Sequence, residues 1–315
     1  MLKINAKKAF RAAMAIVCAS TLVAGVSACG ASSAASGSDK VALLVSTLNN
    51  PFFVDLRDGA QEEADKLGVE LLVSDAQNDS ATQQNQAQNA QAQGVKAVII
   101  NPVDSDAASP AVAPLLSASL PVISVDRSVT GEDVTSHIAS DNVAGGAQAA
   151  DELAKELGEK GDVIILQGIP GAASTRDRGD GFKNEIKKYS GIKIAAEQTA
   201  NFDRSEALDV TSNLMQANPN VVGIYAENDE MALGAVQALG SKAGTDVKVF
   251  GFDGTADGLK AIADGTMTGT IAQQPKELGK QAVQAAVKAI KGESVEKTQS
   301  VDVKTVTKEN VADFQ

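Results

Sequence analysis

Residues 40–53 read KVALLVSTLNNPFF and predict, in order, a strand, a turn and the start of a helix. The apolar run 41–47 has the length and the branched side chains of a buried strand. Two asparagines then form a polar turn, and Pro51 stands where the first turn of a helix tolerates proline. The pattern continues over 54–67 as an amphipathic helix, so the segment is one strand-turn-helix unit.

The same unit repeats along most of the chain. Apolar runs rich in Val and Ile lie at 41–47, 69–74, 95–101, 122–126, 163–167, 192–197, 221–226, 247–252 and 268–272. Amphipathic stretches lie at 54–67, 81–93, 107–118, 144–157, 181–188, 205–218, 230–239, 255–264 and 275–291. This alternation favours parallel sheets with helices on both faces, and right-handed crossovers make such sheets doubly wound.

The number of strands indicates two sheets rather than one. Nine or ten strands are many for a single open sheet, so we predict one α/β lobe per half of the chain. The passage between the lobes is expected at residues 140–141, after the short segment 136–139. Helix ends carry typical residues. The expected N-caps are Asp79 or Ser80, Asp141, Asp203 and Asp229, and the expected C-terminal stops are Gly68, Gly94, Gly158 and Gly240.

The N-terminus has the pattern of a secretory signal. Three lysines and an arginine within residues 3–11 precede the apolar run 12–26, which is shorter than the about 20 residues of a membrane span. The run ends in small residues and Cys29, which resembles the bacterial lipobox, where the cysteine becomes the lipidated mature N-terminus. The alternative is an ordinary signal with an incidental cysteine. We assign 1–28 as a lipoprotein signal peptide and 29–38, rich in Gly, Ser and Ala, as a flexible tether.

The charge and the cysteines exclude some classes of protein. Without the four basic residues of the leader, 24 basic residues stand against 40 acidic residues, a net charge of −16. Nucleic acid is therefore not expected as a partner, because phosphate binding needs a basic face. Cys18 lies within the leader, so Cys29 would be the only cysteine of the mature chain and no intrachain disulfide could form.

Polar and aromatic residues gather just after the predicted strands, from both halves of the chain. In open α/β sheets, ligands bind outside the carboxyl ends of the strands. The candidate binding residues are Asn50, Phe52, Phe53, Asp126, Arg127, Arg178, Phe202, Asn228, Asp253 and Gln273.

The chemistry of these ten residues favours a carbohydrate. Carboxylates accept hydrogen bonds from hydroxyls, guanidiniums donate them, and amides do both. Phenyl rings offer flat apolar faces for the C–H faces of a sugar ring. A phosphate site would contain few acids, and a site for a fatty ligand would contain few charges. Taken singly, each residue also has an ordinary structural explanation as core, surface ion pair, helix cap or turn; their shared placement at strand ends favours a binding site.

Five strings of the chain resemble the periplasmic sugar-binding protein family, and within it the ribose-binding members. The strings lie at 46–53 (STLNNPFF), 126–127 (DR), 136–142 (SHIASDN), 228–234 (NDEMALG) and 251–255 (GFDGT). The similarity runs through essentially all of the chain from Lys40. The last string is shared with many relatives, whereas the longer ones are more specific.

This resemblance implies the type I periplasmic-binding-protein fold, with two Rossmann-like lobes joined by a hinge of three strands. The lobes are expected at 39–140 plus 274–302 and at 141–273 plus 303–315. One monosaccharide, D-ribose, would be held between them and passed to the permease of an ABC importer. The family's sugar contacts fall on the ten residues named above, and each keeps the residue type expected of a ribose binder. Arg176 lies close to Arg178 in the sequence, and we interpret it as structural.

The lipobox and tether depart from the plain signal of free periplasmic relatives. They predict an exported protein that is lipid-anchored on the extracytoplasmic face of the cell membrane. We also expect it to be a monomer. Allose, psicose, fructose or a furanosyl signal molecule remain alternative ligands. A transcription regulator with this effector fold would need a helix-turn-helix head before Lys40, where the signal and tether stand.

An enzyme on the same architecture is the remaining alternative. The chain has no Gly-x-Gly-x-x-Gly after its first strand, no P-loop and no Gly-x-Ser-x-Gly. We interpret His137, the only histidine, as structural. No His/Cys cluster points to a metal, so neither a metal nor a cofactor is expected.

Overall fold

The computed structural model describes residues 38–315, which form one compact unit. The predicted signal, Cys29 and most of the tether lie outside the described residues. None of the helices in the described part combines the length and the apolar character of a membrane span.

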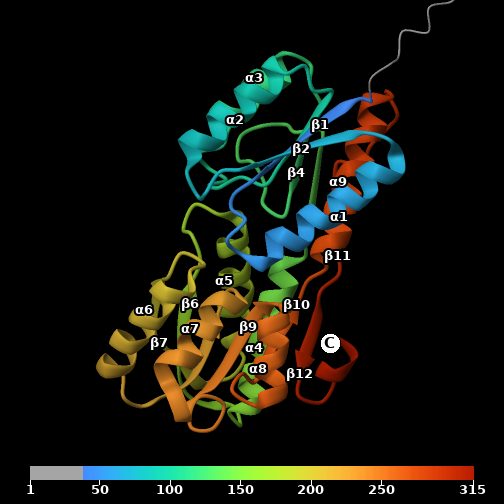
Figure 1. The fold of residues 1–315 in the computed structure, drawn as a ribbon. Coiled ribbons are helices and arrows are strands. Elements are labelled where there is room, and N and C mark those ends of the chain that lie inside the picture. The colour runs from blue at the N-terminus through green and yellow to red at the C-terminus, as the bar shows by residue number, and fades with distance from the viewer. Residues whose placement is uncertain (1–37) are drawn as a thin grey trace, which may run out of the picture. The chain divides into compact units, whose positions relative to one another are not determined.

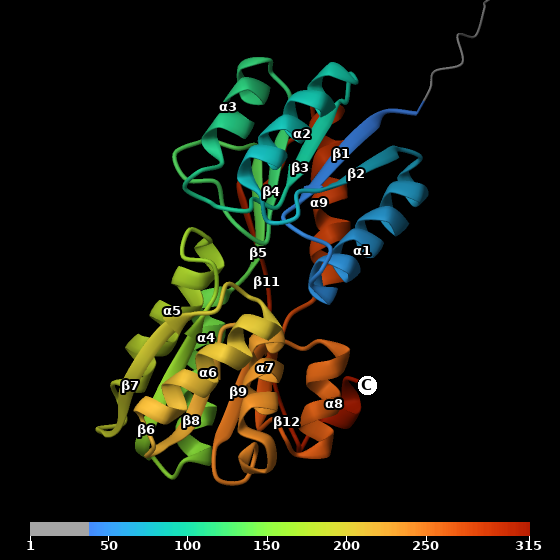
Figure 2. The same cartoon turned by 60° about the vertical axis from the view of Figure 1, so that its left-hand side comes forward.

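The first lobe is built on a six-stranded parallel sheet in the order β11-β5-β4-β3-β1-β2. Figure 1 labels its strands β1, β2, β4 and β11, and Figure 2 also labels β3 and β5. Its strands are β1 (Lys40–Val45), β2 (Glu70–Asp75), β3 (Ala97–Ile100), β4 (Val122–Val125), β5 (Ser136–Ser140) and β11 (Thr298–Val301). Its helices are α1 (Pro51–Leu67), α2 (Ser80–Ala92), α3 (Ser109–Ser117) and α9 (Pro275–Ile290). We refer to this lobe as the N-lobe.

The second lobe has a six-stranded sheet in the order β12-β10-β9-β8-β6-β7, in which only β12 pairs antiparallel (Figure 2). Its strands are β6 (Lys160–Gln167), β7 (Gly191–Thr199), β8 (Val221–Ala226), β9 (Lys248–Asp253), β10 (Gly269–Ala272) and β12 (Lys304–Thr307). Its helices are α4 (Asn142–Glu156), α5 (Ala173–Ile186), α6 (Arg204–Ala217), α7 (Asp229–Leu239) and α8 (Ala256–Asp264). We refer to this lobe as the C-lobe.

Strand β1 shows why the apolar runs are continuous. Val41 and Leu43 pack against α1 and α9 on one face of the sheet. Ala42 and Leu44 pack against α2 and α3 on the other face. Since helices cover both faces, neither set of alternating side chains faces water, and both must be apolar.

The chain passes between the lobes three times. It crosses between β5 and α4, between β10 and α9, and between β11 and β12. The predicted passage at residues 140–141 is the first of these crossings. Because both sheets send the carboxyl ends of their strands toward the crossings, the loops that follow the strands of the two lobes can meet.

Most predicted elements are present, with differences that have physical reasons. Asp79, Asp141 and Asp203 cap helices as predicted. Asp229 as an N-cap is wrong, because Asn228 caps α7 and accepts the hydrogen bond from Met231 N. Asp229 is instead fully buried, and its carboxylate accepts hydrogen bonds from Thr255 and Thr270.

Two further differences come from weak local signals. Helix α5 begins at Ala173, eight residues before the predicted start at 181. The prediction placed the start too late because the first turns of the helix contain small residues, like the glycine-rich loop that precedes them. The short strands β11 and β12 were not predicted. Each has four residues of which only one is buried, so hydrogen bonding to the sheets and not apolar patterning decides their conformation.

Gly59 allows the backbones of α1 and α9 to approach closely, and we expect Gly59→Ala to destabilise the N-lobe. A Cβ at this position would lie 2.2 Å from the carbonyl oxygen of Lys276. Such overpacking should lower the free energy of unfolding by about 1–3 kcal/mol. Urea unfolding followed by circular dichroism measures the change. Glu62→Ala, an exposed position on the same helix, is the control and should leave the midpoint nearly unchanged.

Candidate binding site between the lobes

A cavity between the lobes brings together nine of the ten candidate residues. The space between its walls is small, about 220 Å³ including the part open to solvent. The residues that line it are Asn50, Phe52, Phe53, Asp126, Arg127, Ser174, Arg178, Phe202, Asn228 and Asp253. Gln273 is the candidate that is not part of this lining, and Ser174 is a lining residue that the sequence analysis did not name.

The start of α1 supplies one wall of the cavity. Asn50 caps the helix, and its Oδ1 accepts a hydrogen bond from Phe52 N at 2.9 Å. Pro51 at the first helical position fixes where the helix begins. The rings of Phe52 and Phe53 are buried and meet edge to face, with centroids 5.1 Å apart. This wall is therefore apolar, with one amide at its edge.

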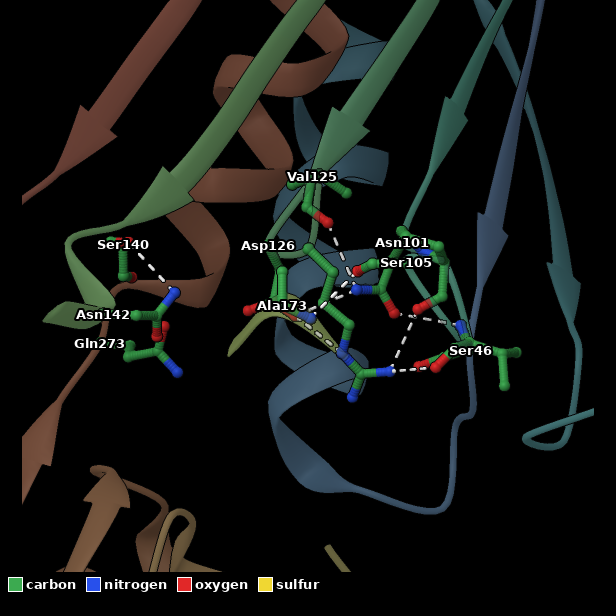
Figure 3. A network of polar contacts seen from close by, with 12 residues as sticks. Ser46, Asn101, Ser105, Val125, Asp126, Ser140, Asn142, Ala173 and Gln273 are labelled. Atoms are coloured by element: carbon green, nitrogen blue, oxygen red, sulfur yellow. Dashed lines mark hydrogen bonds and ion pairs between the residues drawn. The ribbon is translucent and has the colours of Figure 1, made fainter. Parts of the chain in front are cut away.

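Asp126 and Arg127 follow β4, and hydrogen bonds hold both side chains. Figure 3 shows Asp126 beside Asn101 and Val125. Asn101 donates to Asp126 Oδ2 at 3.0 Å, and the other carboxylate oxygen has no hydrogen-bond partner among residues 38–315. The Arg127 guanidinium donates to the carbonyl oxygens of Pro102 and Val103 at 3.1 and 3.2 Å. Both charged side chains are almost fully buried, so these contacts fix their orientation.

Arg178 is the corresponding cation of the C-lobe. Its Nε donates to Asn142 Oδ1 at 2.8 Å and its NH1 donates to the carbonyl oxygen of Glu227 at 2.7 Å. Its guanidinium lies 3.9 Å from the ring centroid of Phe252 and 3.6 Å from Asp253 Oδ1. Three separate elements thus hold Arg178 in place.

Phe202 brings an aromatic ring of the C-lobe to Arg127 of the N-lobe. The Arg127 guanidinium lies over the rings of both Phe53 and Phe202, 5.4 Å from each centroid. The ring of Phe202 packs directly on Gly168, where a Cβ would lie 2.0 Å from it. Asn228 completes this side of the cavity and donates weakly to the carbonyl oxygen of Phe202 at 3.4 Å.

Gln273 acts behind the lining rather than in it. Its Nε2 donates to Asp253 Oδ1 at 2.7 Å, and its buried Oε1 has no hydrogen-bond partner among residues 38–315. Gln273 follows β10 directly and so belongs to one of the crossings between the lobes. The structure therefore places it beside Asp253.

Three lining residues have positive φ angles, which residues other than glycine rarely adopt. The φ angles are +65° at Asp126, +60° at Phe202 and +120° at Asp253. Each such conformation costs about 1–3 kcal/mol and is typical of ligand-binding and catalytic positions. The strain re-aims the side chain at the end of a strand, which supports a binding role for this cavity.

The cavity buries two acids beside two guanidiniums. Asp126 lies 3.7 Å from Arg127 and Asp253 lies 3.6 Å from Arg178, and all four residues are at most 5% exposed. Burial raises the pKa of Asp253 well above its ordinary value, and Arg178 opposes this rise. Burial lowers the pKa of Arg127, and Asp126 opposes that change. Because each guanidinium already has a carboxyl group beside it, the cavity favours an uncharged polar ligand over an anion.

Some polar atoms around the cavity remain unpaired within the protein. Asp126 Oδ1, Arg127 Nε and Gln273 Oε1 are buried and have no partner among residues 38–315. Buried atoms of this kind cost free energy unless they find a hydrogen bond. Asp126 and Arg127 line the cavity, so a ligand rich in hydroxyls can donate to Asp126 Oδ1 and accept from the Arg127 guanidinium.

Direct hydrogen bonds also join the lobes beside the cavity. Ser105 N donates to the carbonyl oxygen of Gly171 at 2.9 Å, and Ala173 N donates to Ser105 Oγ at 3.0 Å (Figure 3). Arg176 forms an ion pair with Asp106 at 3.1 Å, and both side chains are well exposed. Arg176 thus lies outside the cavity lining, whereas Arg178 lies in it.

Sequence reasoning missed the residues that support the site from behind. Asn101 gives no signal in the sequence beyond its place at a strand end, and Ser174 is a small polar residue among several. Glu227 follows β8 and is fully buried, with Oε2 accepting from Gly168 N at 2.8 Å. His137 lies away from the cavity lining and pairs with Ser124 Oγ at 2.8 Å. Only tertiary packing distinguishes these roles.

The fold and the cavity together define a two-lobed solute-binding protein that encloses a small polar molecule. Residues 41–294 match the family described as periplasmic binding protein domain. The chain belongs to this family, whose members work outside the cytoplasm.

Curated relatives and solved structures agree with this assignment. The ribose import binding protein of Salmonella typhimurium is 49% identical over 290 residues, covering 92% of this chain and 98% of the relative. That of Bacillus subtilis is 44% identical over 267 residues, covering 85% and 87%. An ABC transporter periplasmic solute binding protein from Actinobacillus succinogenes, solved with bound D-allose, has a TM-score of 0.82 and 36% identity, covering 87% of this chain and 99% of that one.

Glu227 makes the stability of the protein depend on pH. Burial raises its pKa to about 8. As the pH rises from about 4.5 toward 8, the unfolded chain loses this proton while the folded chain keeps it, so stability falls. Each unit of pKa difference corresponds to about 1.4 kcal/mol.

We expect Glu227→Gln to remove this loss. The amide oxygen can still accept from Gly168 N, so the thermal midpoint of the variant should exceed that of the unaltered protein by a margin that grows between pH 5 and 8. Scanning calorimetry over that range measures it, with Glu62→Gln as an exposed control. A margin that does not change with pH would contradict a neutral Glu227.

Proposed function

We propose that this protein captures a monosaccharide, D-ribose in particular, outside the cytoplasm and delivers it to an ABC importer. The observation that carries the proposal is the cavity itself, which acids, guanidiniums and phenyl rings of both lobes line. Two of its lining atoms, Asp126 Oδ1 and Arg127 Nε, are buried without a hydrogen-bond partner among residues 38–315. The similarity to ribose import binding proteins, at 44–49% identity, supports ribose over other sugars.

Binding would proceed by closure of the lobes about the three crossings. We take 39–140 with 274–302 and 141–273 with 303–315 as the bodies that move. Asp126 and Arg127 are on one body, and Arg178 and Asp253 are on the other. A sugar that contacts both bodies stabilises the closed form, because those contacts exist together only there. The importer would then recognise the closed shape.

Isothermal titration with a panel of monosaccharides tests the ligand. We expect D-ribose to bind most tightly, with allose, psicose and fructose weaker, because a polar buried site leaves its own groups unpaired when a ligand hydroxyl is misplaced. Equal or tighter binding of a hexose would overturn the choice of ribose. An absence of binding for the whole panel would overturn the proposed function.

The roles of the charged residues follow from the same titration. Asp126→Ala and Arg178→Ala each remove a charge-assisted hydrogen bond and should weaken ribose binding by about 1.5–3 kcal/mol. Asp133→Ala, which removes an N-lobe carboxylate whose side chain is 90% exposed, is the control and should bind normally. Normal affinity in either cavity variant would remove that residue from the site.

The lipid anchor is part of the proposal and rests on the sequence alone. Cys29 would carry the lipid, and residues 30–38 would let the folded part move along the membrane surface. Cell fractionation tests this. The unaltered protein should be found with the membrane, and Cys29→Ser should abolish lipidation and the membrane association that depends on it. Membrane association that survives the substitution would contradict the anchor.

The proposal includes no catalysis. The cavity contains acids and arginines paired with one another, and His137 is not among the residues that line it. We infer that a bound sugar is released unchanged. Chromatographic recovery of the sugar after prolonged incubation would reveal any turnover.

A further inference from the structure

Ser174 is a cavity residue whose side chain has no role in the site as described so far. It lies in the first turn of α5, is 2% exposed and lines the cavity. It is also the only lining residue with a hydroxyl. The hydrogen bond of this turn to the N-lobe uses the backbone N–H of Ala173, not the Ser174 hydroxyl.

The spacing along α5 places Ser174 beside Arg178. Residues four apart lie on the same face of a helix, one turn above the other. Arg178 is bonded to Asn142 and Glu227, and it lines the same cavity as Ser174. The face of α5 that points at the cavity therefore carries a guanidinium and a hydroxyl side by side.

Closure of the lobes determines what Ser174 can contact. Its neighbour Ala173 donates to Ser105 Oγ of the N-lobe at 3.0 Å. The first turn of α5 is thus held against the N-lobe, at the boundary where the two halves of the cavity meet. A ligand contact made by Ser174 would be formed in the closed protein, when this turn is in place.

We propose that Ser174 is a specificity-determining residue whose hydroxyl pairs with one hydroxyl of the bound sugar. This inference rests on the proposed function and extends it. A hydroxyl both donates and accepts. It can therefore donate to a sugar hydroxyl whose proton already goes to a carboxylate, or accept from a sugar hydroxyl that already accepts from a guanidinium. A sugar that lacks this hydroxyl would leave the Ser174 hydroxyl without a partner. A sugar with the opposite configuration at that carbon would place its hydroxyl out of reach of Ser174.

The experiment combines variants of Ser174 with deoxy sugars. The tightest monosaccharide of the panel and analogues that each lack one hydroxyl are titrated into the unaltered protein and into Ser174→Ala. We expect Ser174→Ala to weaken binding of the parent sugar about three- to tenfold. For one analogue, the substitution should make no difference, because that analogue lacks the hydroxyl with which Ser174 pairs.

Thr175→Val is the matched control. Thr175 lies in the same turn, and its buried Oγ1 has no partner among residues 38–315, but it does not line the cavity. Removing that hydroxyl should leave all affinities unchanged. Circular dichroism and the thermal midpoint verify that both variants fold.

The outcomes separate this inference from the proposed function. Two results with a protein that binds a sugar would rule out pairing between Ser174 and a particular hydroxyl. In the first, Ser174→Ala binds the parent sugar and every analogue as tightly as the unaltered protein does. In the second, the substitution weakens the affinity for all of them by the same factor. If no sugar binds the unaltered protein, the proposed function fails and this inference fails with it.

Discussion

The burial of four charges between two lobes is the constraint on which the site depends. Asp126 and Arg127 belong to the N-lobe, and Arg178 and Asp253 belong to the C-lobe. A buried charge is tolerated only when it is paired and hydrogen-bonded. Each of these four has protein partners for part of its hydrogen-bonding capacity. Asp126 Oδ1 and Arg127 Nε have no hydrogen-bond partner among residues 38–315, and both residues line the cavity. These two atoms suit a neutral ligand with many hydroxyls.

The elements behind the cavity explain how these side chains are held. Helix caps have two uses here, since Asn50 and Asn228 both end a loop and line the cavity. Backbone strain at Asp126 and Asp253 turns carboxylates inward at strand ends. Packed helices on both faces of each sheet supply the stability that offsets this strain. The site is therefore a property of the whole lobes and not of the loops alone.

The three crossings connect this chemistry to a function of capture and release. Gln273 stands at a crossing and donates to Asp253, while Asn142, just after another crossing, accepts from Arg178. The segments about which the lobes would move thus contact the charged residues directly. A ligand bound to those residues would therefore act directly on the segments that set the equilibrium between the open and closed forms.

The sequence by itself determined the layers of the fold and most of the lining. Apolar runs covered on both faces and cap residues are local signals, and ligand residues of this fold stand at the carboxyl ends of strands. Family resemblance added the choice of Arg178 over Arg176 and the expectation of a hinge of three strands. Tertiary structure alone decided that Asp229 is a buried acceptor, that Gln273 stands behind Asp253, and that Ser174, Asn101 and Glu227 belong to the site or its support. Their roles depend on contacts between side chains of segments that are distant in the sequence, and the pattern of a single segment does not predict such contacts.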